Sequence, residues 1–316
     1  MEKINFKKVR DFGEIFNDSF LFLKKNFKSL FKCILFIPGP IILIAGILSG
    51  YFQAVVGNPS QLFNPMQMGS TWSIMAQVLY VALPYVLLSC LASMVLFSTI
   101  YNYIIAYNNK PAGEVITVSE IGKTIPGSVW RLFYNNLLLL LISLILIIAV
   151  GLFAMIPFLG AIGLFFGMII LFPPLMYTIT AANYLVLRDK VLITDGIAKA
   201  WKYMRGKFWW TWLLVVCVGM IVWVASLIFT LPLSILSIGK MITRMNPADM
   251  STEGNSINTL PYIVFGAIAY LGQQLVQPII HIFCAFNFSS HEEAHEGTGL
   301  LERMDEIGND TASNPE

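Results

Sequence analysis

The sequence predicts an all-α fold, a polytopic transmembrane helical bundle of about six spans. Of its 316 residues, 57% are hydrophobic and 12% are charged, whereas a soluble domain carries about 45–50% apolar and about 25% charged residues. The mean hydropathy is +0.72. Four long stretches contain no Asp, Glu, Lys or Arg: 33–109, 132–187, 208–239 and 254–291. These features exclude a soluble domain, a disordered chain and a disulfide scaffold.

The uncharged stretches are long enough to hold six membrane helices. Crossing the hydrocarbon core takes about 20 apolar residues, and backbone groups in lipid must hydrogen-bond within their own helix. The first two stretches contain 77 and 56 residues, so each is expected to hold two spans, divided by the polar segment 57–70 and the turn at 156–160. The spans are expected at 33–52, 74–106, 132–155, 160–187, 208–232 and 260–288.

An amphipathic helix is expected before the first span. Phe12, Phe16, Phe20, Leu23 and Phe27 recur every three or four residues, which places them on one helical face. Asp11 and Glu14 have the spacing of a capping box at the start of this helix. The other faces carry basic residues, namely Lys24, Lys25 and Lys28.

The same arrangement returns before the fifth span and, more weakly, before the third. A shift of 181 residues superimposes Phe20 on Trp201 and Phe27 on Phe208. The third copy, 117–132, is expected to be interrupted at Pro126. The chain therefore reads as three parallel repeats, each with one cytoplasmic amphipathic helix and a two-span hairpin. The basic side of the second copy consists of Lys199, Lys202, Arg205 and Lys207.

These amphipathic helices have two interpretations. They can anchor the protein at the interface by binding anionic lipid, or they can simply cap the bundle on its cytoplasmic side. The residues expected to anchor are Phe16, Phe20, Lys24, Lys25, Lys28, Trp201, Lys202 and Arg205.

The distribution of basic residues predicts the orientation. With the N-terminus inside, 18 of the 20 Lys and Arg residues fall in inner segments, and only Lys240 and Arg244 fall in outer loops. Both termini are thus expected in the cytoplasm of a bacterium with the spans in its inner membrane. The expected parts are a basic amphipathic segment (1–32), a six-span membrane domain (33–288) and an acidic cytoplasmic tail (289–316).

Two short segments resemble a known family. Residues 20–28 (FLFLKKNFK) and 198–209 (AKAWKYMRGKFW) are similar to the membrane domain of bacterial glycerophosphoryl diester phosphodiesterases, here in a stand-alone form of the kind found in Bacteroidetes. The resemblance implies a shared membrane architecture. It does not imply the catalytic activity, because only 28 residues follow residue 288, too few for the catalytic barrel of that family.

One polar stripe stands out within the spans. Gln273, Gln277 and His281 lie at positions i, i+4 and i+8 of the sixth span. Polar residues inside a membrane are costly and commonly functional, so the stripe could line a polar path or bind a lipid headgroup. The alternative is hydrogen bonding between helices. Small-residue spacings at Gly46/Gly50 and at Gly163/Gly167 favour close helix packing within the chain over a homodimer contact.

The residues needed for catalysis are sparse. No Asp or Glu lies in any expected span, so proton-coupled transport and intramembrane proteolysis through a carboxylate are disfavoured. His291, Glu292, His295 and Glu296 have a spacing that could bind a metal weakly, but a solvated acidic tail explains them as well. The four cysteines are expected to be packing residues.

The sequence therefore favours a non-enzymatic integral membrane protein that organises lipid or a partner protein at the inner membrane. The alternative is a transporter or lipid-translocating protein that uses the polar face of the sixth span. Anionic lipid headgroups are the expected partners, together with an unidentified protein. No cofactor, no metal and no nucleic acid are expected.

Overall fold

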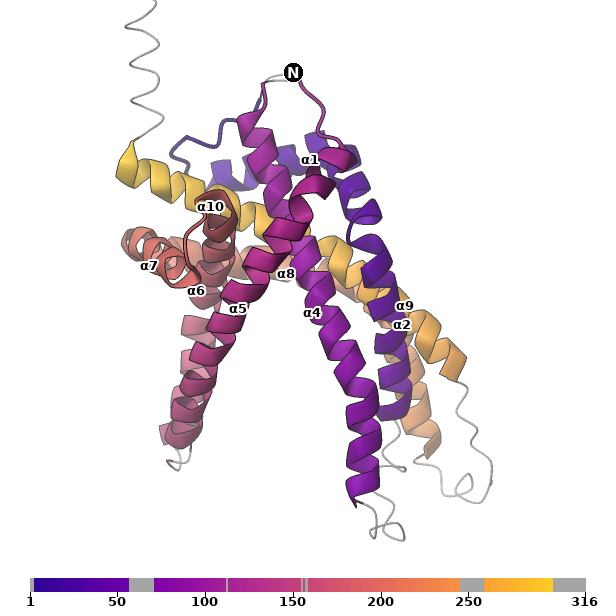
Figure 1. Ribbon diagram of the computed structural model, residues 1–316. Coiled ribbons are helices and arrows are strands. Elements are labelled where there is room, and N and C mark those ends of the chain that lie inside the picture. The colour runs from indigo at the N-terminus through magenta and orange to yellow at the C-terminus, as the bar shows by residue number, and fades with distance from the viewer. Residues whose placement is uncertain are drawn as a thin grey trace, which may run out of the picture. The chain divides into compact units, whose positions relative to one another are not determined.

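The computed structural model describes residues 3–56, 71–111, 113–154, 156, 159–244 and 259–297, and this part of the chain is helical without any strand (Figure 1). The α-helices in chain order are α1 (Phe12–Phe36), α2 (Gly39–Val56), α4 (Thr71–Asn109), α5 (Val118–Ala154), α6 (Leu159–Arg188), α7 (Ile193–Met204), α8 (Phe208–Arg244), α9 (Thr259–Val276) and α10 (Pro278–Glu296). A 3₁₀ turn, η2 (Arg205–Lys207), joins α7 to α8.

Most of these helices are long and apolar enough to cross a membrane. Among the described residues, five segments qualify, and the bent pair α1–α2 brings the count to six if it is one span. The chain is therefore a multi-pass, all-α membrane protein, as the sequence predicts. The expected linker 57–70 lies outside the described residues. The five segments are Val78–Asn109, Val118–Ile148, Phe165–Arg188, Ile193–Gly239 and Thr259–Glu296.

The start of α1 confirms the predicted capping box. The Glu14 N–H donates to Asp11 Oδ1 at 2.7 Å, and the Asp11 N–H donates to Glu14 Oε2 at 3.1 Å. These reciprocal bonds satisfy two backbone donors that a helix start otherwise leaves without partners. The helix then continues past the expected boundary at residue 33 and ends at Phe36, where the chain bends by 63° into α2.

The predicted interruption at Pro126 is wrong. Helix α5 runs without a break from Val118 to Ala154 and includes Pro126, so the third copy of the amphipathic segment is continuous with its span. Proline removes one backbone hydrogen bond and thereby bends a long helix without necessarily ending it.

The predicted sixth span is divided. Helix α9 ends at Val276 and α10 begins at Pro278, with Gln277 in the turn between them. Helix α10 then passes residue 288 and ends at Glu296. Residues 289–296 of the expected acidic tail are therefore helical, and the remainder of that tail, from residue 298, lies outside the described residues.

The described helices form two compact units. Unit 1 comprises Met1–Lys32, Ser98–Met220 and Ile279–Glu316, and unit 2 comprises Cys33–Phe97 and Ile221–Pro278. Unit 1 thus contains α5, α6, α7 and α10, whereas unit 2 contains α2 and α9.

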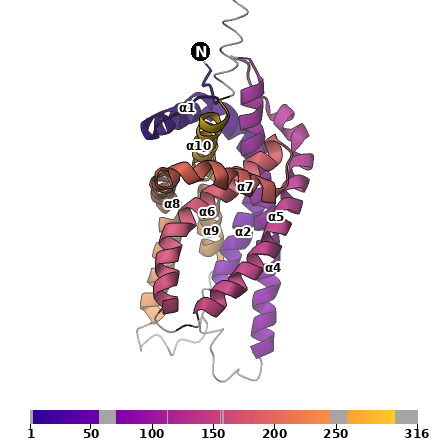
Figure 2. The same cartoon turned by 90° about the vertical axis from the view of Figure 1, so that its left-hand side faces the viewer.

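Aromatic side chains fill the core of unit 1. Phe6, in the segment before α1, stacks on Phe286 of α10 with ring centroids 4.1 Å apart. The short helix α7 lies across α6 (Figure 2) and packs on both α6 and α5. The largest fully buried side chains of this unit include Phe22, Tyr101, Tyr103, Tyr177, Tyr184, Phe283, Phe286 and Phe288.

Glycines bring α2 and α9 of unit 2 into backbone contact. A Cβ added at Gly46 would lie 3.1 Å from the Cα of Ala267, and one added at Gly50 would lie 2.5 Å from the Cα of Ile263. Gly266 faces the backbone of Gly50 in turn. This contact confirms that the Gly46/Gly50 spacing serves packing within the chain. At the second spacing, a Cβ built at Gly163 would lie 2.7 Å from the Phe153 ring of α5, whereas nothing lies within 4 Å of one built at Gly167.

Helices α5 and α6 expose large apolar side chains along most of their length. Ile145 is 72% exposed and Met168 is 71% exposed. Exposing so large a continuous apolar surface to water is unfavourable in free energy, whereas contact with lipid acyl chains is not. Further exposed residues on these helices include Leu140, Leu141, Leu144, Leu146, Ile147, Ile148, Phe165, Phe166 and Leu171.

The 181-residue shift found in the sequence also relates the burial of α1 and α7. It pairs buried residues with buried residues: Ile15 with Gly196, Ser19 with Ala200, and Phe22 with Tyr203. It also pairs exposed Phe20 with exposed Trp201. The two helices therefore use equivalent faces for packing, as expected for a structural repeat.

Candidate functional site

A buried arginine holds the N-terminal segment in place. Arg10 is 3% exposed, and its Nε donates to Asp18 Oδ2 at 2.8 Å. Its guanidinium also donates to the carbonyl oxygens of Asn5, Phe6 and Lys8. The Arg10 N–H donates to Ser290 Oγ of α10 at 2.8 Å. One residue, through its side chain and its backbone N–H, therefore fixes a non-helical segment against two helices.

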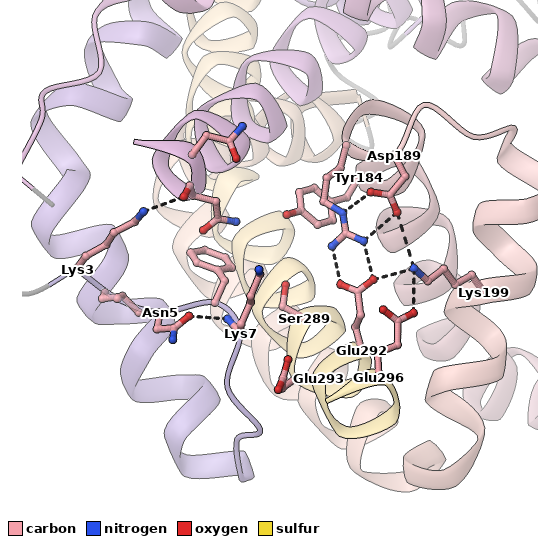
Figure 3. Close-up of a pocket in the computed structure, with 15 residues that line it drawn as sticks. Lys3, Asn5, Lys7, Tyr184, Asp189, Lys199, Ser289, Glu292, Glu293 and Glu296 are labelled. Atoms are coloured by element: carbon pink, nitrogen blue, oxygen red, sulfur yellow. Dashed lines mark hydrogen bonds and ion pairs between the residues drawn. The ribbon is translucent and has the colours of Figure 1, made fainter. Parts of the chain in front are cut away.

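A charged cavity of about 770 Å³ lies in unit 1 (Figure 3). The N-terminal segment forms one wall, and the ends of α4 and α6 together with α7 and α10 form the rest. Acidic and basic side chains are equally represented in it. The lining residues are Lys3, Ile4, Asn5, Phe6, Lys7, Asn108, Asn109, Tyr184, Arg188, Asp189, Lys199, Ser289, Glu292, Glu293 and Glu296.

An ion-pair network forms one wall of this charged cavity. Both terminal nitrogens of Arg188 donate to the two carboxylate oxygens of Glu292 at 2.6 Å, a bidentate pair. Lys199 Nζ lies 2.8 Å from Glu292 and 3.4 Å from Glu296. In Figure 3 the side chains of Asp189, Lys199, Glu292 and Glu296 point toward one another.

The network joins three helices of unit 1. Arg188 ends α6, Lys199 lies on α7, and Glu292 and Glu296 lie on α10. Glu296 also accepts a hydrogen bond from the hydroxyl of Tyr203. Because each carboxylate in the network faces a basic group, the network holds the end of α10 against α6 and α7. We call it the clamp.

The residues of the predicted polar stripe have different environments. Gln273 on α9 is exposed, Gln277 in the turn is half-buried, and His281 on α10 is buried. The prediction placed all three on one regular helix, and the turn at Gln277 interrupts that helix. Gln273 and Gln277 belong to unit 2, whereas His281 belongs to unit 1.

His281 takes part in a buried hydrogen-bond chain. Its Nδ1 lies 2.8 Å from the hydroxyl oxygen of Tyr101, and that hydroxyl lies 3.1 Å from the carbonyl oxygen of Thr180. These bonds link α4, α6 and α10 within unit 1, which is the packing role that the sequence leaves open for this histidine. His291 pairs similarly with Thr211 of α8 at 3.0 Å.

Except for Phe16, the predicted anchoring residues of α1 are exposed. Phe20 is 43% exposed, and the equally placed Phe27 and Phe31 are 59% and 36% exposed. Lys24 and Lys28 are exposed beside them. Helix α1 packs on the rest of unit 1 through Ile15, Ser19, Phe22 and Leu30, and the ring of Phe20 also lies 5.2 Å from that of Phe283 on α10. Phe16 is half-buried, with its ring 5.0 Å from that of Phe283.

The predicted anchoring residues of the second copy are exposed as well. Trp201 is 41% exposed, and Lys202 and Arg205 are exposed next to it. Two further aromatic residues, Trp209 and Trp210 at the start of α8, are 66% and 59% exposed. Aromatic and basic side chains therefore share the outer surface here, as they do on α1.

Sequence reasoning missed the clamp on α10. It treated His291, Glu292, His295 and Glu296 as part of a solvated tail or as weak metal ligands, whereas Glu292 faces Arg188 and His295 stacks on Tyr203 with ring centroids 4.9 Å apart. Within the described ranges, no group of three His, Cys, Asp or Glu side chains is arranged to hold a metal ion. The regular i, i+4 spacing of Glu292 and Glu296 was the one available signal.

Comparisons with known proteins return no match: no family model, no curated protein and no solved structure resembles the chain significantly. The resemblance to phosphodiesterase membrane domains thus remains a prediction from two short segments.

Proposed function

We propose that this protein is a non-enzymatic, multi-pass membrane protein that binds anionic phospholipid headgroups at one face of the bacterial inner membrane. Helices α1 and α7 carry the binding surface, and both chain termini lie on the cytoplasmic side. The spans hold the protein in the bilayer, and the basic aromatic surface selects the lipids around it.

The observation that carries the proposal is the outer face of α1. Phe20, Phe27 and Phe31 form an exposed aromatic strip, with the rings of Phe27 and Phe31 stacked 5.6 Å apart. At 3.6 residues per turn, Lys24 and Lys28 fall directly beside this strip. Aromatic rings favour the boundary between acyl chains and headgroups, and lysines favour anionic phosphate. This outer surface thus has the composition of an interfacial lipid-binding helix.

Helix α7 supports the proposal independently. Its buried face, formed by Ile193, Gly196 and Ala200, packs on α5 and α6, so its outer face is left for solvent or lipid. That face presents Trp201 and Lys202, and exposed Arg205 follows in η2. Two helices with equivalent packing faces thus present the same combination of side chains outward.

The proposal is tested by measuring lipid binding to the purified full chain. Native mass spectrometry would compare phosphatidylglycerol, which is anionic, with phosphatidylcholine of equal chain length, at low and high salt. The wild type is expected to prefer phosphatidylglycerol and to lose this preference in high salt, because exposed charges are screened. The double variant Lys24→Gln/Lys28→Gln is expected to lose most of the preference.

The control variant removes two charges elsewhere. Lys8→Gln/Lys190→Gln changes two exposed lysines by the same net charge and leaves the α1 surface intact, so its lipid preference should match the wild type. Equal binding of both lipids by the wild type, or equal losses in the two double variants, would refute the proposed function.

A further inference from the structure

Two buried hydroxyl groups border the charged cavity of unit 1 without a hydrogen-bond partner. Tyr184 and Ser289 line this cavity and are 1% and 7% exposed. Neither hydroxyl meets the geometry of a hydrogen bond with any group in the described chain. Arg188 lies over the Tyr184 ring, 5.3 Å from its centroid, and directs its terminal nitrogens at Glu292 instead. Buried polar groups are nearly always paired, so the cavity is suited to a polar ligand.

The two hydroxyls lie between walls of opposite charge. In Figure 3, the clamp is on one side of Tyr184 and Ser289, and Lys3 is on the other. The clamp has one more carboxylate than it has bases, which gives it a net negative charge. Its carboxylates are those of Asp189, Glu292 and Glu296, and its bases are Arg188 and Lys199.

Lys3 supplies a positive charge that no carboxylate of the described chain neutralises. Its Nζ donates to the carbonyl oxygens of Asn108, at 2.8 Å, and Lys110, at 2.6 Å. These carbonyls are neutral, so they solvate the charge without cancelling it. An ammonium group has three N–H donors, and these two bonds leave the third for a ligand.

The negative wall also retains an acceptor. Glu296 Oε1 accepts from the Tyr203 hydroxyl and lies 3.4 Å from Lys199 Nζ, whereas Glu296 Oε2 accepts no hydrogen bond from the residues that the structure describes. The cavity as a whole has as many acidic as basic side chains. A ligand with a net charge would therefore bring an unmatched charge into it, which is unfavourable.

We propose that the charged cavity is a binding site for a small zwitterionic solute, one that carries both an ammonium group and a carboxylate. The carboxylate of the solute binds Lys3, and its ammonium group binds the carboxylates of the clamp. The hydroxyls of Tyr184 and Ser289 bind the polar groups between them. A short peptide and a free amino acid share this chemistry, and a cavity of about 770 Å³ has the size of a small-molecule site.

Ligands that differ in one terminal charge test the proposal without altering the protein. Trialanine, N-acetyl-trialanine, trialanine amide and alanine would be titrated against the purified full chain in neutral detergent by calorimetry. Trialanine is expected to bind at least about tenfold more tightly than either blocked peptide, because each block removes a charge-assisted hydrogen bond. If alanine binds as tightly as trialanine, the solute is an amino acid, and if it binds more weakly, the solute is a peptide.

Two tyrosines of α6 supply a matched pair of variants. The hydroxyls of Tyr177 and Tyr184 are both buried without a hydrogen-bond partner in the described chain, and only Tyr184 lines the cavity. Tyr184→Phe is expected to weaken trialanine binding about fivefold, and Tyr177→Phe should leave it unchanged. A thermal unfolding scan would verify the fold of each variant.

Lys3→Gln tests the positive wall. This change is expected to weaken trialanine binding by about tenfold and to leave the weaker binding of trialanine amide unchanged, because the amide has no carboxylate. Lys8→Gln is the control, since Lys8 belongs to the same N-terminal segment and does not line the cavity.

Equal affinities for trialanine and its two blocked forms would overturn the zwitterion site, as would the absence of binding by both trialanine and alanine. Equal effects of Tyr184→Phe and Tyr177→Phe would overturn it as well. The site goes beyond the proposed function and uses none of the exposed aromatic and basic residues of α1 and α7, so these outcomes leave lipid binding in place.

Discussion

At the scale of single residues, the buried charge of Arg10 in unit 1 is compensated by several partners. Arg10 satisfies three backbone carbonyls and one carboxylate, and its guanidinium carbon lies 5.1 Å from the centroid of the Phe286 ring. Removing such a group leaves its partners buried without hydrogen bonds, which costs more than the intact bonds contribute. The segment 3–10 forms no helix, so it is held by contacts of this kind, together with the stacking of Phe6 on Phe286 and the hydrogen bonds of Lys3.

Arg10→Met is therefore expected to destabilise the protein by about 3–5 kcal/mol, the cost of breaking a buried ion pair. The free energy of unfolding can be measured by SDS titration in mixed micelles. Lys8→Met is the control, because the Lys8–Glu14 pair is 46% and 41% exposed and should contribute less than about 1 kcal/mol. Similar losses in both variants would contradict the assigned role of Arg10.

At the scale of helices, two kinds of contact hold neighbours together. Glycines let α2 and α9 of unit 2 approach to backbone contact, and ion pairs hold α10 to α6 and α7 in unit 1. Lipid offers no hydrophobic drive for helices to associate, so packing and polar contacts must supply it. Each kind of contact is open to a direct test.

Gly50→Ala is expected to cost about 1–3 kcal/mol, because the new Cβ would overlap the backbone of α9 at Ile263 and push the helices apart. Gly219→Ala on α8 is the matched control, since nothing lies within 4 Å of a Cβ at that position. Alanine favours a helix over glycine by about 1 kcal/mol, so the control should be neutral or stabilising. SDS titration of both variants measures the difference, and a neutral Gly50→Ala would count against the contact.

The clamp on α10 is expected to show energetic coupling between Lys199 and Glu292. Their side chains are 32% and 14% exposed, so solvent screens this pair less than a surface pair. A double-mutant cycle with Lys199→Gln and Glu292→Gln should give a coupling of about 1–2 kcal/mol. The corresponding cycle for Lys8 and Glu14 should give less. A coupling no larger than that of this surface pair would show that the network does not clamp the helix.

At the scale of the whole molecule, the number of crossings decides the topology. Five segments of the described chain can span a membrane, or six with the bent pair α1–α2. Six crossings put both termini on one side, and five put them on opposite sides. The bias of 18 of 20 basic residues toward one set of segments favours six crossings with a cytoplasmic N-terminus.

Cysteine labelling tests this topology. In a variant whose four native cysteines are replaced by alanine, Val115→Cys and Glu296→Cys are expected to react with a membrane-impermeant maleimide only from the cytoplasmic side. Gly239→Cys is expected to react only from the opposite side. Labelling of positions 115 and 296 from opposite sides would contradict the six-span topology.

The class of the protein and most of its helices could be predicted from the amino-acid sequence. Uncharged stretches marked the spans, the Asp11–Glu14 spacing marked the start of α1, and the repeat with a shift of 181 residues identified equivalent packing positions. The face of each helix that contacts protein could not be predicted and is known from the fold. The periodic aromatic face of α1 is divided between protein contact and the exposed surface: Phe16 and Phe20 contact Phe283 of α10, whereas Phe27 is 59% exposed. The physical reason is that lipid and protein interior are both apolar, so periodicity along a membrane helix cannot distinguish them. The partners of Glu292 also depended on the fold, because Arg188 and Lys199 lie about a hundred residues away in sequence.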